Sequence, residues 1–364
     1  MKYKILHDLI SIQTDGSSEN HQKCIQYITD YIKKEIPQCI IKPIPTNGKD
    51  NLIIGLNIKK LKDIRTGLML CGHLDVVEGK LQQFIPYADD NKIYGRGTSD
   101  MKGAITCYLE MVQYFNTLSY PVIMCFTCDE ETNMQGIKDV CVFLKKQNIF
   151  PHLTILGEPT NNKLGISSTG IKSYKTIIHG VSAHSSVPNK GVNALYVAAK
   201  IVHSLEMIMK KMQSNKLYLN VGSLTGGGNI AVIPDKAEIE WGYRYINEKD
   251  VEETMKLYSN IISEIAKEYS ETSIETIQTY EFLGYSATNN NQIHQLCHDL
   301  EVEQTHLSYT SEAGYLAEIG QSVYLFGCGN IEQAHSDNEF ICIDELSAYK
   351  QNLRKLTEIY REIL

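Results

Sequence analysis

Acidic side chains and histidines follow several short apolar stretches of this 364-residue chain. The residues that come shortly after these stretches are His73, Asp75, Glu130, Glu131 and Glu158. A loop of sequence GRGTSDMKG adds Asp100, and a glycine-containing segment after residue 326 leads to His335. In an open α/β sheet, ligands bind at the carboxyl ends of the strands. If the apolar stretches are strands, we expect these side chains to meet at one edge of a sheet.

Two histidines and several carboxylates form a set of nitrogen and oxygen ligands that zinc, cobalt or manganese accepts. Five ligands are too many for one catalytic ion that keeps an open position, and they suit two ions that share a carboxylate. Each motif alone has a plainer explanation. An aspartate before a helix is usually an N-cap, and three consecutive acidic residues usually form a solvated loop. Their occurrence at successive strand ends favours a dinuclear metal centre.

Helices and strands alternate through the first 160 residues. The expected helices are 2–12, 19–35, 101–118 and 136–146, and the expected strands are 51–57, 67–72, 122–127 and 153–156. This alternation is typical of an α/β domain with a mostly parallel central sheet flanked by helices.

The pattern changes after residue 160. The order strand, helix, strand, strand, helix, strand is expected at 173–180, 191–213, 217–224, 237–246, 249–269 and 273–282. This is the order of a ferredoxin-like sandwich. From residue 291 the chain returns to helix, a short strand (323–326) and a closing helix (343–364). We therefore expect a discontinuous catalytic domain, residues 1–163 plus 283–364, and an inserted α+β lid domain, residues 164–282.

The charge balance excludes some classes of partner. Lys plus Arg is 35 and Asp plus Glu is 43, which gives a net charge of −8 and argues against nucleic acid or an anionic membrane as partner. The longest apolar runs fall far short of the about 20 residues that span a bilayer. The N-terminal sequence has polar breaks where a signal peptide needs an unbroken apolar core. We expect a cytoplasmic protein whose cysteines are buried, reduced thiols.

Seven segments of the chain resemble the dinuclear zinc family of aminoacylases, dipeptidases and deacetylases, and acetylornithine deacetylase in particular. They are GHLDVV, GRGTSDMKGA, TCDEETNMQG, LGEPT, HGVSAHSSVPNKGVNA, GGGNIAVIPD and CGNIEQAHSDNEF. They lie between about residues 67 and 340 in the family's order. The resemblance implies a zinc-exopeptidase-like fold with a lid inserted after GEPT.

The resemblance also implies a ligand set. His73, Asp100 and Glu158 would bind one divalent ion, and Asp100, Glu131 and His335 would bind the other, with Asp100 as the bridge. Zinc is the first expectation for both ions, with cobalt or manganese as alternatives.

Further roles are carried over in the same way. Glu130 would be the general base that takes a proton from the attacking water, and Asp75 would accept a hydrogen bond from the far nitrogen of His73. His184 would stabilise the tetrahedral intermediate, often from the partner subunit of a homodimer formed through the lid; its plainer reading is a surface residue. The peptide bond between Asp100 and Met101 is expected to be cis.

Three residues are candidates for substrate binding. Glu312 would pair with a substrate ammonium, although a carboxylate at a helix N-terminus is an equally good explanation. Arg244 would bind the substrate α-carboxylate as a bidentate pair, and Asn229 would contact the substrate backbone.

The sequence thus predicts a metal-dependent amidohydrolase acting on a small N-acyl amino acid. N2-acetyl-L-ornithine, cleaved to L-ornithine and acetate in arginine biosynthesis, is the first expectation. The alternatives are a related N-acyl-amino-acid deacylase, a desuccinylase or a dipeptidase. A catalytically dead binding relative would lack a ligand or the base, and the sequence retains all of them.

Overall fold

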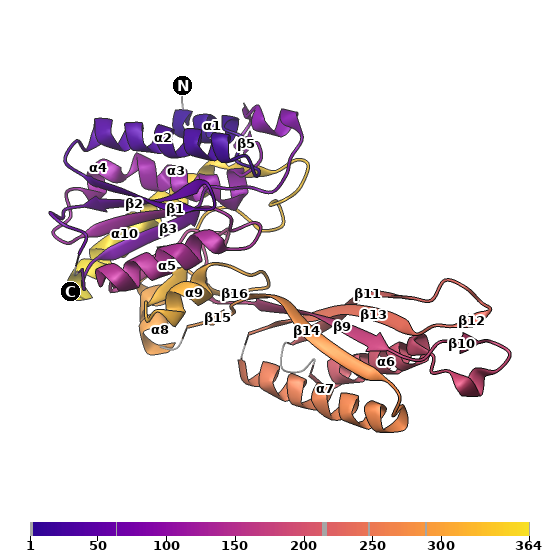
Figure 1. Cartoon of the computed structure of the whole chain (residues 1–364). Coiled ribbons are helices and arrows are strands. Elements are labelled where there is room, and N and C mark those ends of the chain that lie inside the picture. The colour runs from indigo at the N-terminus through magenta and orange to yellow at the C-terminus, as the bar shows by residue number, and fades with distance from the viewer. Residues whose placement is uncertain (1–2, 63, 213–216, 247, 288–289, 364) are drawn as a thin grey trace. The chain divides into compact units, whose positions relative to one another are not determined.

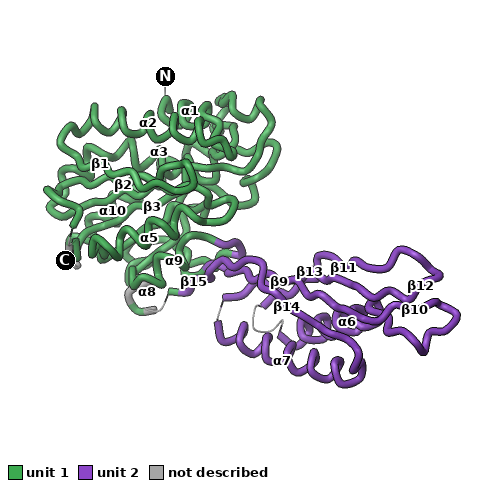
Figure 2. The backbone as a smooth tube through the Cα atoms, viewed as in Figure 1, with its two compact units in different colours: residues 1–167, 287–307, 311–364 green, residues 168–286, 308–310 purple. Residues whose placement is uncertain are grey.

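The computed structural model describes the chain except residues 1–2, 63, 213–216, 247, 288–289 and 364 (Figure 1). The chain forms two compact units (Figure 2). Unit 1 comprises residues 1–167, 287–307 and 311–364, and unit 2 comprises residues 168–286 and 308–310. The predicted helix ends at Lys2, Gln213 and Leu364 lie outside the described residues.

The middle strands of the unit 1 sheet run parallel to one another. They are β3 (Leu68–His73), β6 (Val122–Thr127), β7 (Leu153–Leu156) and β17 (Val323–Leu325). The antiparallel strands beside them are β1 (Ile40–Thr46), β2 (Lys49–Leu56) and β8 (Leu164–Ser168), in the order β1-β2-β6-β3-β7-β17-β8. Every residue of β3 and β6 is buried, which is typical of parallel strands covered on both faces.

Helices cover both faces of this sheet (Figure 1). One core cluster joins alternate strand residues, such as Leu68 and Leu70, to α1 (Lys4–Ser11), α2 (Ser18–Glu35), α3 (Gly103–Glu110) and α10 (Ile343–Ile363). The opposite face carries α5 (Gln135–Gln147), which packs against β1, β2 and β6, with α9 (Ala313–Glu318) beside it. The other elements of unit 1 are η1 (Leu81–Phe84), β4 (Tyr87–Asp89), β5 (Lys92–Tyr94), η2 (Thr98–Lys102), α4 (Val112–Phe115), α8 (Asn290–Leu300), β16 (Gln304–Leu307) and β18 (Phe340–Cys342).

Unit 2 is a four-stranded antiparallel sheet with two helices. In chain order its main elements are β9 (Gly170–His179), α6 (Ala194–Met212), β11 (Tyr218–Gly226), β13 (Lys236–Tyr245), α7 (Glu248–Glu268) and β14 (Ser273–Phe282). The strand order β11-β13-β9-β14 is that of a ferredoxin-like sandwich. Alternate residues of β13, among them Ile239 and Trp241, are buried in the core formed with α6 and α7. The short elements are β10 (Ala183–His184), η3 (Pro188–Lys190), β12 (Val232–Ile233) and β15 (Tyr285–Ser286).

The predicted fold class, a mostly parallel α/β sheet with an α+β insertion, is confirmed. Some details differ from the prediction. Residues 164–167, assigned to the lid, belong to unit 1 because β8 pairs with β17 there, whereas residues 283–286 and 308–310 belong to unit 2. The helix expected at 101–118 begins at Gly103, since Asp100 and Met101 have non-helical dihedral angles, and it breaks at Met111. No helix in the described ranges is both long and apolar enough to cross a membrane.

A buried lysine ties the N-terminal helix to the segment that carries Asp100. The Lys102 side chain is fully buried, and its ammonium donates to the main-chain oxygens of Leu9 (2.8 Å) and Ile12 (3.0 Å) at the end of α1. Carbonyls at a helix C-terminus lack partners within the helix, so a cation there satisfies them. Burial lowers the pKa of Lys102 to about 8.

We expect Lys102→Met to destabilise the protein by about 1–3 kcal/mol, because the substitution leaves buried carbonyls without donors. The control is Lys350→Met, which removes a partly exposed ion pair with Glu110 and should cost at most about 1 kcal/mol. Urea unfolding followed by circular dichroism would measure both. Equal losses in the two variants would contradict the role assigned to Lys102.

Candidate metal centre

Three parallel strands deliver their polar residues to one edge of the sheet. The register pairs His73 at the end of β3 with Thr127 at the end of β6, and it pairs Cys71 with Leu156 at the end of β7. The residues that follow each strand therefore start from neighbouring points. Glu130 and Glu131 follow β6, and Glu158 follows β7.

The carboxylate of Asp100 lies between two histidines. Its Oδ1 is 3.0 Å from Nε2 of His73, and its Oδ2 is 3.4 Å from Nε2 of His335. The same nitrogen of His335 lies 3.0 Å from Oε1 of Glu131. Asp100 is only 7% exposed, so its two oxygens face these partners rather than water. The peptide bond between Asp100 and Met101 is cis, as the resemblance implied.

The predicted ligands form overlapping groups of three. Potential ligand atoms lie within 4.8 Å of one another in His73–Asp100–Glu158 and in Asp100–Glu131–His335, and a third such group is His73–Glu130–Glu131. The first two groups share Asp100. The structure thus brings together all five residues that the sequence singled out as ligands, with Glu130 beside them.

The charge state of these groups fits bound cations. Burial raises the pKa of Glu158 and of Glu130, and neighbouring carboxylates add to that effect. Oε1 of Glu158 and Oδ1 of Asp75 are buried and have no hydrogen-bonding partner in the described part of the chain. Buried carboxylate oxygens without donors are costly unless a cation compensates them. The nitrogen and oxygen donors present suit divalent zinc, cobalt or manganese.

Hydrogen bonds couple Asp100 to both histidines. Burial opposes ionisation of Asp100, but hydrogen bonds with His335 and His73 hold its pKa below the ordinary value. The hydrogen bonds with Asp100 and Glu131 raise the pKa of His335 to about 10. Asp100 is therefore the carboxylate best placed to neutralise positive charge on both sides.

Thiols take no part in this cluster. Cys125 and Cys128 form a CxxC pair at the end of β6, a motif that often binds zinc. Both are buried, and burial raises the pKa of Cys128, so its thiolate is disfavoured. None of the ligand groups found among the described residues includes a cysteine.

The structure places Asp75 beside the far nitrogen of His73 through its main chain and not through its carboxylate. Nδ1 of His73 lies 2.9 Å from the main-chain oxygen of Asp75, whereas the Asp75 carboxylate is 3.9 Å away. Oδ2 of Asp75 instead accepts a hydrogen bond from the main-chain N–H of Glu131 (3.0 Å). Asp75 thus orients both neighbouring ligands, one through its main chain and one through its side chain.

Glu312 lies in unit 1 at the N-terminus of α9 and is fully buried. Burial raises its pKa to about 7, and Oε1 has no hydrogen-bonding partner within the described ranges. Its charge acts on both Glu130 and Glu158. It makes no capping hydrogen bond with the helix, although it occupies the N-terminal position that the alternative explanation requires.

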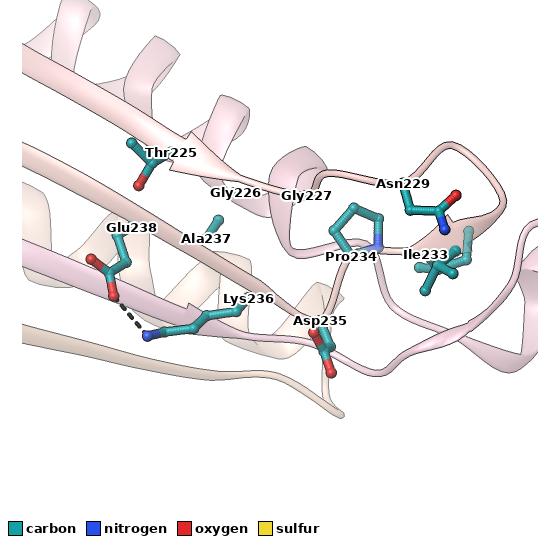
Figure 3. Close-up of a pocket in the computed structure, with 11 residues that line it drawn as sticks. Thr225, Gly226, Gly227, Asn229, Ile233, Pro234, Asp235, Lys236, Ala237 and Glu238 are labelled. Carbon is teal, nitrogen blue, oxygen red and sulfur yellow. Dashed lines mark ion pairs between the residues drawn. The ribbon is translucent and has the colours of Figure 1, made fainter.

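His184 and Asn229 lie at one end of unit 2. His184 in β10 pairs in register with Val232 in β12, and Val232 and Asn229 both line a cavity of about 410 Å³ (Figure 3). Lys236, the first residue of β13, lines the same cavity. Asn229, Val232 and Lys236 thus line one hollow at this end of unit 2.

Arg244 lies at the other end of β13, eight residues beyond Lys236. At about 3.3 Å per strand residue, this separates the two positions by roughly 26 Å. Arg244 faces a different hollow, lined also by Tyr218 and Tyr280. Arg244 and Asn229 thus line different hollows of unit 2, and their predicted roles in substrate binding stay predictions.

Two functional candidates were not singled out from the sequence, Arg96 and Glu339. They form a buried ion pair with Arg96 Nη1 2.7 Å from Glu339 Oε2. Both lie inside motif segments, GRGTSDMKGA and CGNIEQAHSDNEF, that were considered only for metal ligands. The signal available in the sequence was two opposite charges near Asp100 and His335.

A model of peptidase family M20/M25/M40 matches residues 69–362, which include every residue of the cluster. The chain belongs to this family. It is accordingly a metal-dependent amide hydrolase, as predicted.

Known members of the M20/M25/M40 family match over nearly the whole chain. An acetylornithine deacetylase of Buchnera aphidicola subsp. Schizaphis graminum is 26% identical over 97% of this chain and 96% of that protein. The acetylornithine deacetylase of Proteus mirabilis is 27% identical over 96% and 92%. The crystal structure of aminopeptidase PepT from Bacillus cereus has the same fold, with a TM-score of 0.80 over 99% of both chains at 18% identity.

We expect the apoprotein to bind two equivalents of zinc and His335→Ala to bind only one, because His73, Asp100 and Glu158 remain. The control is His298→Ala, which removes a highly exposed histidine and should retain both. Inductively coupled plasma mass spectrometry after dialysis measures the ratio. Two tightly bound ions in His335→Ala would contradict the ligand assignment.

Proposed function

We propose that this M20-family chain hydrolyses the amide bond of an N-acyl amino acid, and that its substrate is N2-acetyl-L-ornithine, cleaved to L-ornithine and acetate. The observation that carries the chemistry is the Asp100 carboxylate between His73 and His335 in a cluster of buried acids. The names of the near-full-length relatives support the substrate and a place in arginine biosynthesis.

The proposed ligands are His73, Asp100 and Glu158 on one side and Asp100, Glu131 and His335 on the other. Two divalent ions there, zinc in the first place, would polarise the amide carbonyl and ease ionisation of the attacking water. The two carboxylate oxygens of Asp100 face the two histidines, so the bridging role falls to this residue.

Glu130 is proposed as the general base. It lies in a ligand group with His73 and Glu131, and burial raises the pKa of its carboxyl. A carboxylate with a raised pKa is a stronger base, which suits it to take a proton from water at neutral pH. It then passes that proton to the leaving nitrogen, so that the amine departs neutral.

His184 is proposed to donate a hydrogen bond to the developing oxyanion. Its Nδ1 accepts from the main-chain N–H of Ser186 (3.2 Å), which leaves the proton of a neutral ring on Nε2. The side chain is exposed, as a residue lent to a second subunit must be before assembly. We propose a homodimer formed through unit 2, in which His184 and Asn229 serve the partner's substrate.

Glu312 is proposed to recognise a positively charged substrate side chain. Its buried oxygen without a partner would gain an ion pair with the ammonium of ornithine. A related deacylase, desuccinylase or dipeptidase is the second candidate, favoured by the likeness in fold to an aminopeptidase. These candidates differ in the acyl group or the side chain that the pocket must accept.

The test of the substrate is amine release by the zinc-loaded protein from N2-acetylornithine, N-acetylnorvaline, N-succinyl-diaminopimelate and a dipeptide. We expect the highest kcat/KM for N2-acetylornithine. Glu312→Gln should reduce that value by about 10- to 100-fold while changing N-acetylnorvaline, which has no ammonium, much less. Preference for the succinyl compound or the dipeptide would replace the proposed substrate.

Glu130→Gln should retain both metal ions and lose at least about 100-fold in kcat, because the glutamine side chain cannot accept the proton of the attacking water. The control is Glu332→Gln, an exposed residue of the loop before His335, which should keep wild-type activity. Metal content and initial rates are measured on the same samples. Full activity of Glu130→Gln would refute its assignment as the base.

A further inference from the structure

A single buried carboxylate binds the loop that carries Asp100. Glu339 is 2% exposed, and its Oε1 accepts from the main-chain N–H groups of Ser99 (2.9 Å) and Asp100 (3.2 Å). Its Oε2 accepts from the main-chain N–H of Gly97 (2.9 Å) and from Arg96 Nη1 (2.7 Å). All four donors belong to residues 96–100.

The ion pair also holds the segment that carries His335. Arg96 Nη1 donates to the main-chain oxygen of Ser336 (3.3 Å), the residue after His335. A second link runs through Ser99, whose hydroxyl accepts from the main-chain N–H of Asn330 (2.8 Å) and donates to its carbonyl (2.9 Å). The loop of Asp100 and the loop of His335 are therefore fastened to each other at their backbones.

Neither loop has a strand or a long helix to fix it at this point. Gly97 adopts a left-handed φ of 84°, which turns successive N–H groups toward one centre. Convergent main-chain N–H groups form a concave anion site, and a charged acceptor makes each hydrogen bond stronger than a neutral one would. Here the anion is the protein's own Glu339, which fixes the Asp100 main chain directly.

The other ligands are held differently. His73 is the last residue of β3 and Glu158 comes two residues after β7, so the sheet ladder sets their positions. Asp100 and His335 lie outside the sheet, and the Arg96–Glu339 pair is one of the links that set the distance between their segments. A change in this pair should therefore affect the ion shared by Asp100 and His335 most.

We propose that Glu339 and Arg96 are positioning residues that set the spacing of Asp100 and His335, and thereby the affinity for the second metal ion. This inference rests on the proposed dinuclear centre. Neither side chain needs to touch metal or substrate, because each acts through main-chain atoms of the ligand loops.

The test is zinc titration of the apoprotein by competition with a chromophoric chelator. In Glu339→Gln, one of the two binding steps should weaken by about 10- to 100-fold, as when a group that orients a ligand is removed. The other step should weaken less, because its ligands His73 and Glu158 are set by the sheet. Activity lost at limiting zinc should return with excess zinc, with KM for N2-acetylornithine little changed.

A second variant and a control keep the test decisive. Arg96→Lys retains the charge but not the forked geometry and should weaken the same step, so the inference remains testable if Glu339→Gln fails to fold. The control is Asp139→Asn. The Asp139 carboxylate lies on α5 and accepts hydrogen bonds from Thr46 and Gln135, so this change should leave both zinc-binding steps unchanged. Circular dichroism and thermal unfolding identify variants that have simply lost their fold.

The outcomes separate this inference from the proposed function. If the wild-type apoprotein fails to bind two zinc ions, the dinuclear centre itself is wrong. If the wild type binds two and folded Glu339→Gln and Arg96→Lys also bind both with wild-type affinity, the positioning role is overturned. Placing Glu339→Gln in His335→Ala should weaken binding of the one remaining ion less than Glu339→Gln weakens binding of the second ion in the wild type; an equal or larger loss would also overturn the positioning role.

Discussion

The chemistry of this protein depends on one carboxylate that contacts two histidines. Asp100 comes from a loop, yet its two oxygens must face His73 from the sheet and His335 from a distant part of the chain. A displacement of its main chain would disturb both contacts at once. The buried hydrogen bonds from the Asp100 loop to Glu339 make this arrangement a property of the fold rather than of the flexible aspartate side chain.

The surrounding acids are arranged at a cost to the apoprotein. Glu130, Glu158 and Glu312 are close enough to act on one another's charge, and burial raises the pKa of all three. Such crowding is typical of functional sites, where a ligand supplies the missing charge. The repulsion among these acids of unit 1 therefore lowers the stability of the metal-free protein and raises the affinity of the cluster for cations. Cation binding in turn stabilises the fold.

The sequence was most informative where the backbone is regular. Buried parallel strands predicted that His73, Glu131 and Glu158 would meet, since strand ends share one edge of the sheet. The same reasoning could not name the accepting atom of Asp75, because a hydrogen bond from the His73 ring is equally well accepted by a main-chain carbonyl. Nor could it show which hollow of unit 2 Arg244 lines, since a residue type alone does not give the direction of a side chain. Arg96 and Glu339 were not predicted because, apart from their ion pair with each other, their partners are backbone groups, which a pattern of residue types does not show.

Unit 2 begins and ends on neighbouring strands. Ile171 near the start of β9 pairs in register with Phe282 at the end of β14, so the two connections to the rest of the chain leave side by side, about 5 Å apart. The insertion of more than a hundred residues therefore spans no more distance between its two ends than a short loop would. Such an architecture lets evolution exchange or remodel the whole insertion without shifting a single metal ligand of unit 1.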